Sequence, residues 1–499
     1  MSVDTPNRSA YSSGLSIEQN GINIIGEGER KGRPADLFWP WCAANISFFG
    51  MSYAAFVLYF GLSFRQAAIA SVIGTVLSFL LVGFVSLAGK RGSAPTMALS
   101  RAAFGVRGNA LPTLASYLIL VGWETVLVAV STLATSAIIQ DLGWSSGNLT
   151  KVVAFLVTAF LIVLGGVLGF DVIMRMQKWL TYATVVITIV YMVLTAHDID
   201  WSKVTSMQSG TTSAFIGALI LMMTAFGLSW VNSAADYSRY LPRRSSGGGV
   251  VGWTTFGGAI APVILLLYGL LLIGSRPKLI DGIAADPLGT LATLLPTYFL
   301  IIYAIVVIAG LVAGAVLDIY SSGLALLTLG LPVPRWLAAL FDGVIMVCGA
   351  IYIVWFAQNF LGPFEGFLVT LGVPIASWCG IFLADLLLRR RDYDQLALFD
   401  SRGRYGAVNP AAVLVMLISM AVGWGMVVST ASGFHWQGYL LGPIGLGGKG
   451  GVWAFANLGV GFALVFSFLA YLLLCRGRVR AQERWEVASD EPIAPVRTL

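Results

Sequence analysis

Long apolar runs dominate this chain, and short polar segments separate them. A helix that crosses the hydrocarbon core of a bilayer needs about 20 mostly apolar residues, because the core is about 30 Å thick and each residue adds about 1.5 Å. Twelve runs meet this requirement, so the pattern predicts an all-α polytopic membrane protein with 12 transmembrane helices. The expected spans are 38–60, 67–89, 110–139, 151–169, 178–196, 213–236, 249–274, 299–329, 341–360, 366–388, 411–430 and 453–475.

The composition agrees with this pattern and excludes several classes of protein. Only 11% of the 499 residues are charged and 57% are hydrophobic, whereas soluble globular proteins carry roughly a quarter charged residues. This excludes a soluble enzyme, a disordered chain and a secreted disulfide scaffold. The four cysteines lie in apolar runs without metal-ligand spacing. Since no nucleophile, base or metal motif stands out either, we expect no enzymatic activity, no metal and no cofactor.

The basic residues indicate how the spans are oriented, because loops rich in lysine and arginine stay in the cytoplasm. With the N-terminus inside, 24 of the 30 basic residues fall in cytoplasmic segments and six fall outside. We therefore expect a multi-pass protein of the plasma membrane with two cytoplasmic tails, 1–37 and 476–499. The basic residues are scattered among short loops, so we expect no nucleic-acid partner and no obligatory protein partner. Six tryptophans near span ends are expected to anchor the bilayer interfaces: Trp39, Trp41, Trp144, Trp201, Trp336 and Trp453.

Two spans carry small and polar residues at mid-length. The first span has Pro40 and then the run 43–47 (AANIS), and the sixth has the run 225–233 (AFGLSWVNS). Inside a bilayer, freed backbone groups are tolerated only where they line a cavity or bind something, so such breaks indicate the central site of a transporter. The alternative is that the small residues mark tight helix contacts.

The positions of these two spans also predict an internal repeat. They are five spans apart, and five is odd, so two five-span units would sit in the membrane with opposite orientations. We expect a first repeat over 38–196, an inverted second repeat over 213–388 and two accessory helices over 411–475.

Two acidic residues lie well inside predicted spans. Glu124 follows Trp123 about half-way along the third span, and Asp318 lies in the inner half of the eighth. An acid near the bilayer centre costs about 2.5 to 3.5 kcal/mol on insertion scales, so either residue is a candidate proton carrier. The alternative is an acid capped by neighbouring hydroxyls such as Thr125 or Tyr320, with a role in helix packing alone.

Other charges near the span ends have simpler explanations. Asp236 and Arg239 are three residues apart and share a helix face, which favours a structural pair or a cytoplasmic gate element. Asp342 and Asp385 lie near helix ends, where we expect them to meet water or loop arginines.

Several segments together resemble a known family of transporters. They are residues 29–63 (ERKGRPADLFWPWCAANISFFGMSYAAFVLYFGLS), the inner loop 94–112 (APTMALSRAAFGVRGNALP), Gly122-Trp123, and 235–242 (ADYSRYLP). In this combination the chain resembles the nucleobase:cation symporter family, in its purine/cytosine permease branch. The resemblance extends over nearly all twelve spans in order, and its most specific motifs are SRAAFG and ADYSRYLP.

The resemblance implies a LeuT-like fold, in which spans 1, 2, 6 and 7 form a bundle and spans 3, 4, 8 and 9 form a scaffold, with two accessory helices. It also implies a flat heterocyclic substrate stacked at mid-depth between one aromatic side chain of span three and one of span six. The first is Trp123. The second falls near Gly227 and is assigned to Phe226, with Trp230 as the alternative. The groups that would contact the edge of the heterocycle are Asn45, Glu124, Ser229 and Asp318.

One departure from the family concerns the coupled cation. Sodium-coupled proteins with this fold use carbonyl groups of span one, which here correspond to Ala44 and Ser47, and hydroxyls of span eight. Residues 309–317 (AGLVAGAVL) contain no serine or threonine. We therefore expect a proton, carried by Glu124 or Asp318, unless the register shifts by one turn and brings the serines at 321 and 322 to the site.

The predicted function is secondary active import of a nucleobase, such as cytosine or a purine, together with a proton. A planar base offers two faces for aromatic stacking and a polar rim for selection, which suits the expected site. The alternatives are a sodium-coupled carrier of allantoin, a hydantoin or another small heterocycle, and an amino-acid carrier with the same fold. A channel or a membrane-embedded enzyme is less consistent with polar residues clustered at one depth.

Overall fold

The computed structural model describes residues 20–144, 147–167, 170–357, 359–431 and 433–484. These residues form helices joined by short loops, and no strand occurs among them. The helices are α1 Phe38–Asn45, α2 Phe48–Tyr59, α3 Phe64–Gly92, α4 Thr96–Phe104, α5 Ala110–Asp141, α6 Asn148–Val167, α7 Phe170–Thr195, α8 Trp201–Thr205, α9 Thr212–Ala225, α10 Ala234–Ser238, α11 Gly247–Ser275, α12 Leu279–Ala285, α13 Pro287–Ala292, α14 Thr297–Leu329, α15 Arg335–Ile351, α16 Leu361–Leu388, α17 Pro410–Gly425 and α18 Leu458–Arg484.

The all-α polytopic architecture predicted from the apolar runs is confirmed. Ten helical segments in the described part of the chain are long and apolar enough to cross a bilayer, and α1 with α2 make an eleventh span bent by 63°. The shorter apolar helix α17 corresponds to the eleventh predicted span. Each of the twelve predicted runs therefore coincides with a helix or a broken helix.

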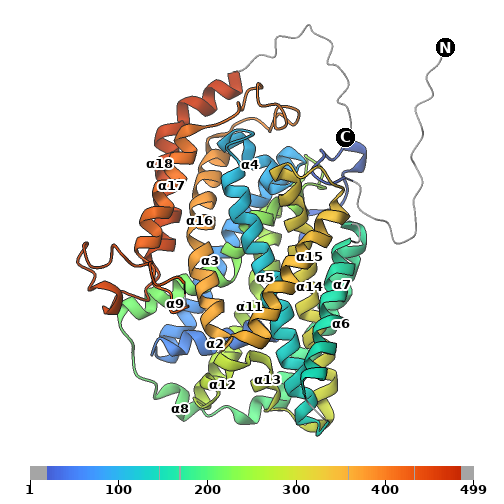
Figure 1. The fold of residues 1–499 in the computed structure, drawn as a ribbon, viewed down its shortest axis with the longest axis vertical. Helices are drawn as coiled ribbons and strands as arrows, with labels where there is room; N and C mark the ends of the chain where they lie inside the picture. The colour runs from blue at the N-terminus through green and yellow to red at the C-terminus, as the bar shows by residue number, and fades with distance from the viewer. Residues whose placement is uncertain (1–19, 145–146, 168–169, 358, 432, 485–499) are drawn as a thin grey trace, which may run out of the picture.

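The helices pack as two groups. In one group α11 lies against α1, α2 and α3. In the other, α14 and α5 pack against each other and both contact α6 and α15. This grouping matches the bundle and scaffold that the LeuT-like fold implies. The accessory helices α17 and α18 pack on α16 at one side (Figure 1).

Both interruptions predicted at mid-span are present. The first span stops at Asn45 and resumes at Phe48, because Ile46 leaves the helical conformation (φ −83°, ψ 81°). The sixth span stops at Ala225, passes through two 3₁₀ turns over 227–229 and 231–233, and resumes as α10. These two breaks place irregular backbone in the interior of the protein, where other helices cover it.

Several segments expected to be loops or tails are ordered. The inner loop 94–112 contains α4, which is fully buried. Residues 20–37 cross the same end of the molecule, where the Lys31 amide donates to the Tyr240 carbonyl at 2.8 Å. We call this end, predicted to face the cytoplasm, the inner end. The last helix continues to Arg484, nine residues beyond the predicted end of the last span at 475, and the predicted tail residues 1–19 and 485–499 lie outside the described chain.

Candidate functional site

A small cavity lies where the two broken spans face α5 and α14. Its volume is about 50 Å³, which is room for a few water molecules. It is lined from the first span by Ala44, Asn45, Ser47, Phe49, Gly50 and Tyr53, from α5 by Trp123 and Leu127, from the sixth span by Ala225, Phe226 and Trp230, and from α14 by Gly310, Leu311, Gly314 and Asp318.

The break in the first span is stabilised by its own polar side chains. The Asn45 amide nitrogen donates to the Trp41 carbonyl at 2.8 Å, and Ser47 caps α2 by accepting from the Phe49 amide at 3.2 Å. Asparagine and serine offer the backbone such local partners, which is why they favour helix ends over helix interiors. No donor to the Asn45 amide oxygen occurs among the described residues.

The break in the sixth span is stabilised by a hydrogen bond to α3 and by another within the span itself. The Gly227 amide donates to the Ser78 hydroxyl at 3.0 Å, and the Ser229 hydroxyl donates to the Thr224 carbonyl at 2.6 Å. A Cβ atom on Gly227 would lie 2.3 Å from the carbonyl carbon of Ser78, so only glycine permits this approach. Gly227 and Ser229 thus maintain the break and do not line the cavity.

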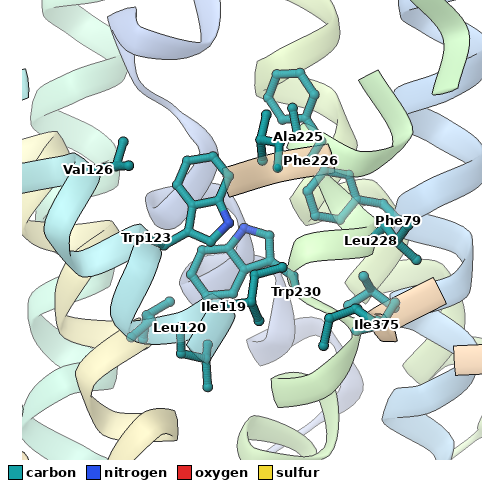
Figure 2. Close-up of a cluster of buried hydrophobic side chains, with 14 of the residues drawn as sticks. Phe79, Ile119, Leu120, Trp123, Val126, Ala225, Phe226, Leu228, Trp230 and Ile375 are labelled. Atoms are coloured by element: carbon teal, nitrogen blue, oxygen red, sulfur yellow. The ribbon is translucent and has the colours of Figure 1, made fainter. Parts of the chain in front are cut away.

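Three aromatic side chains form walls of the cavity. Figure 2 shows the indoles of Trp123 from α5 and Trp230 from the sixth span projecting toward one another, with Phe226 farther along the same span. The Trp123 ring is held edge-on by Phe364 and Phe367 at 5.7 and 5.8 Å between ring centroids. Its indole nitrogen is buried and has no hydrogen-bond partner among the described residues. Such walls suit a flat ligand that presents hydrogen-bond acceptors at its edge.

A cluster of aromatic rings closes the cavity on its outer side. Tyr53 lies 5.1 Å from Phe226 and 5.8 Å from Phe364 between ring centroids. Phe49 contacts Phe360 and Phe364 at 5.8 and 5.7 Å. The rings come from the first span, the sixth span and α16, so a ligand could reach the cavity from this side only after these elements separate.

A second set of contacts lies between the cavity and the inner end. Trp41 is fully buried and meets Trp230 and Tyr237 edge-on, with ring centroids 5.7 and 5.4 Å apart. The expectation that Trp41 anchors the bilayer interface is therefore wrong. The Tyr237 hydroxyl donates to the Leu317 carbonyl of α14 at 2.8 Å, which ties the sixth span to the scaffold.

Asp236 and Arg239 form hydrogen bonds with different residues. Asp236 accepts from the backbone amide of Thr96 at 2.7 Å and from its hydroxyl at 2.8 Å, so it binds the N-terminus of α4. Arg239 donates to the Gly21 carbonyl at 2.8 Å and to the Tyr320 hydroxyl at 2.9 Å. Both residues thereby connect the inner half of the sixth span to neighbouring elements.

Asp318 is the acidic residue that faces the cavity. It is 1% exposed, and neither of its carboxyl oxygens has a hydrogen-bond partner in the described part of the chain. One turn earlier on α14, a Cβ atom on Gly314 would lie 3.6 Å from the Ala44 carbonyl, and one on Gly310 would lie 3.6 Å from the Ile46 carbonyl. Glycines therefore stand beside the carbonyl groups at the first break, and an unpaired carboxyl group lies next to them.

Glu124 points away from the cavity, into the scaffold. Its carboxyl oxygen lies 2.8 Å from the Ser322 hydroxyl, which also lies 2.8 Å from a carboxyl oxygen of Asp342 on α15. A hydroxyl has one hydrogen to donate, so a second contact of this kind requires a hydrogen on a carboxyl group. Both contacts can be hydrogen bonds only if one of the two carboxyl groups is protonated. The expectation that Asp342 meets water or an arginine is wrong, because it is fully buried.

The described chain brings most of the predicted site residues to one place. Ala44, Asn45 and Ser47 line the cavity with Trp123, Phe226, Trp230 and Asp318, whereas Glu124, Gly227 and Ser229 lie outside it. Sequence reasoning missed Tyr53 and Leu127. Leu127 is four residues after Trp123 and thus on the same helix face, a spacing that could have identified it. Ser321 and Ser322, considered as sodium ligands, instead contact the Tyr237 hydroxyl at 3.2 Å and the two scaffold acids.

Comparison with known proteins identifies the family. Over residues 24–442 the sequence matches the family described as permeases for cytosine/purines, uracil, thiamine and allantoin. It is 26% identical over 419 residues to YxlA of Bacillus subtilis (strain 168), named as a candidate purine-cytosine permease, covering 81% of this chain and 87% of that one. It is also 26% identical over 390 residues to the cytosine permease of Escherichia coli (strain K12), covering 76% of this chain and 83% of the relative.

A solved structure with the same fold is that of Mhp1, a nucleobase-cation-symport-1 family transporter, in a closed conformation with bromovinylhydantoin bound. The TM-score is 0.69 at 17% identity, and the match covers 94% of this chain and 99% of Mhp1. The LeuT-like arrangement expected from the sequence is thus confirmed. The family match spans most of the chain and includes both broken spans, so this chain is a member of the cytosine/purine permease family.

Proposed function

We propose that this permease imports a nucleobase or a closely similar heterocycle together with a proton, by alternating access between the bundle and the scaffold. The observation that carries this proposal is the cavity at the two breaks, where aromatic walls surround unpaired polar atoms. The excess of basic residues in the predicted inner segments favours cytoplasmic tails, and import follows if the coupled proton enters the cell down its gradient.

The aromatic and the polar side chains of the cavity suit different parts of such a ligand, namely the faces and the edge of its ring. Trp123 would stack on one face of the ring, and Phe226 or Trp230 on the other. Stacking contributes about 1 to 3 kcal/mol per base and tolerates many bases, so selectivity has to come from polar groups at the edge. Asn45, the Trp123 indole nitrogen and Asp318 are our candidates for that purpose.

The small volume of the cavity supports a mechanism in which the two groups of helices move. About 50 Å³ is much less than the roughly 300 Å³ or more of typical ligand sites. Aromatic contacts lie on the outer side and the Trp41–Trp230–Tyr237 contacts lie on the inner side. We infer that substrate enters when the outer contacts separate and leaves when the inner contacts do.

Asp318 is our candidate for the residue that takes up the proton. None of the described residues that line the cavity carries a positive charge. An ionised carboxylate without a partner is costly in this environment, whereas a bound proton removes the charge. Glu124 and Asp342 both contact Ser322, one helical turn further along α14. We infer that this pair accepts the proton from Asp318 on the way to the inner end.

Sodium coupling is the competing proposal, and one observation favours it. The break at Ile46 frees carbonyl groups of the first span next to α14, as a sodium site would require. The two positions facing them are Gly310 and Gly314, which supply no hydroxyl oxygen. A hard cation that needs several oxygen ligands would therefore depend on Asp318 as well.

Uptake into proteoliposomes tests the substrate and the ion together. We expect labelled cytosine or adenine to accumulate with an imposed proton gradient, and amino acids not to compete. Asp318→Asn should abolish accumulation driven by the proton gradient, whereas the matched control Asp281→Asn, at an exposed site on α12, should not. Accumulation that follows a sodium gradient and ignores protons would overturn the proton proposal. Amino-acid competition would overturn the nucleobase proposal.

A further inference from the structure

A groove at the inner end gathers five arginines from two distant parts of the sequence. It has a volume of about 530 Å³ and lies between the end of α16 and the last turns of α18. Arg390 and Arg391 line one side, and Arg476, Arg480 and Arg484 line the other. Although basic residues are scattered along the sequence, the fold collects these five into one concave site.

The register of α18 explains one wall of the groove. Arg476, Arg480 and Arg484 are spaced four residues apart, so they form one stripe on the same helix face. Like charges at this spacing disfavour a helix, and all three side chains are exposed. None of the three guanidinium groups has a hydrogen-bond partner within the described ranges. The stripe therefore presents unpaired guanidinium groups that an external anion could satisfy.

The one acidic residue in the groove is already occupied. A Glu483 carboxyl oxygen accepts from the backbone amides of Arg390 and Arg391 at 2.7 and 2.9 Å, which fixes the two walls to each other. The Arg391 guanidinium donates to the Glu483 carbonyl at 3.1 Å. Five arginines against one glutamate leave four positive charges without a counter-charge.

Exposed leucines beside the groove indicate that it opens near the depth of the lipid headgroups. Leu473 and Leu474 are 81% and 64% exposed, as expected for side chains that face lipid, and the arginine stripe begins two residues later. Leu387, 67% exposed, lines the groove itself. The headgroup region is about 5 to 8 Å deep on each side of a bilayer, and the stripe rises about 12 Å from 476 to 484. At least the first two arginines therefore lie at headgroup level.

We propose that this groove binds the phosphate headgroup of an anionic phospholipid from the inner leaflet. Arginine is suited to this role because its planar guanidinium binds phosphate oxygens in pairs. Basic pockets between transmembrane helices on the cytoplasmic side are of the kind that binds anionic headgroups. The exposed leucines at the rim would contact the acyl chains. This proposal is independent of the transported substrate.

Two other anions could occupy the groove. Free inorganic phosphate has the same chemistry as the headgroup. The chain itself continues beyond Arg484 with three acidic residues, Glu486, Asp490 and Glu491. The leucines at the groove edge favour a ligand with an apolar part, which free phosphate lacks. The lipid-facing Leu473 and Leu474 beside the groove favour a lipid over the acidic segment, because they place acyl chains next to it.

The experiment measures lipid retained by the full-length protein. Protein purified in detergent is mixed with equal amounts of phosphatidylglycerol and phosphatidylcholine, and bound lipid is counted by native mass spectrometry. The groove variant is R476Q/R480Q/R484Q. The matched control R107Q/R244Q/R402Q removes the same charge from three exposed arginines elsewhere at the inner end. Each basic residue near an anionic surface changes affinity about five-fold, so the groove variant should bind phosphatidylglycerol roughly 100-fold more weakly.

The outcomes separate the three occupants. Equal losses in the groove variant and the control would overturn the proposal, because they would show a diffuse effect of surface charge. Displacement of the lipid by millimolar inorganic phosphate would assign the groove to free phosphate instead. Stronger lipid binding by E486Q/D490N/E491Q would show that the acidic segment occupies the groove. Selective loss in the groove variant alone, with an unchanged unfolding temperature, supports the lipid site.

Discussion

Replacement of Trp123 tests how the cavity recognises its ligand. The Trp123 ring is 8% exposed, is held edge-on by two phenylalanines and leaves its indole nitrogen without a partner within the described chain. The side chain can therefore contribute in two separable ways. It can stack on a base, for about 1 to 3 kcal/mol, and it can donate one hydrogen bond, for about 1 kcal/mol.

Two substitutions separate these contributions. Trp123→Phe keeps an aromatic face and removes the donor, so we expect the dissociation constant for cytosine to rise about five-fold. Trp123→Ala removes both, for about 2 to 4 kcal/mol, so we expect a rise of roughly 30- to 700-fold. The matched control is Trp355→Ala, which removes an indole that packs on Phe155, 5.5 Å away, in the scaffold.

Binding of labelled cytosine to purified protein, measured by a scintillation proximity assay, gives the dissociation constants directly. The thermal unfolding temperature of each variant shows whether the protein is still folded. An unchanged dissociation constant in folded Trp123→Ala protein would remove Trp123 from the site. Equal effects of the Phe and Ala substitutions would refute stacking and leave the hydrogen bond as the whole contribution.

Three further predictions concern stability and gating. Gly227→Ala places a Cβ atom against the backbone of α3 and should lower the unfolding temperature by an amount equivalent to about 1 to 3 kcal/mol. The control Gly252→Ala should leave the unfolding temperature unchanged, because nothing lies within 4 Å of the added Cβ atom. Equal effects of the two substitutions would contradict the role of Gly227 in the close approach to α3. Asp385→Asn should cost about 3 to 5 kcal/mol in chemical denaturation, because it leaves the buried Arg389 guanidinium without the carboxylate that it contacts at 2.6 and 2.9 Å. Tyr237→Phe removes a hydrogen bond to α14, so hydrogen exchange of the backbone amides in α10 should become about five-fold faster. An unchanged exchange rate would argue against a role of the Tyr237 contacts in closing the inner side of the cavity.

The broken spans could be predicted because their cause is local. Asparagine and serine provide alternative partners for the backbone, and small residues make close approach possible, so residues 43–47 and 225–233 indicated the breaks by their types alone. The same local chemistry appears in the structure, where Asn45 bonds to the Trp41 carbonyl and Ser47 caps the next helix. Trp123 could be placed beside the breaks because the sequence resembles the family.

The orientation of Glu124 could not be predicted in this way. Consecutive residues of an α-helix are about 100° apart, so Trp123 and Glu124 cannot both face one small cavity. Either residue was a reasonable candidate until the neighbours of α5 were known. Their packing decides the matter, because Ser322 and Asp342 meet the Glu124 carboxyl group on the scaffold side of α5.

The sequence by itself determined the all-helical membrane architecture, the approximate positions of the spans, their interruptions and the chemical types available at mid-depth. These follow from bilayer thickness and from local backbone preferences, which do not depend on distant residues. Only the tertiary structure decided that Asp318 faces the cavity, that Glu124 and Asp342 share Ser322, and that five arginines form one groove. Each of these depends on which helix faces meet, and that is set by packing between segments far apart along the chain.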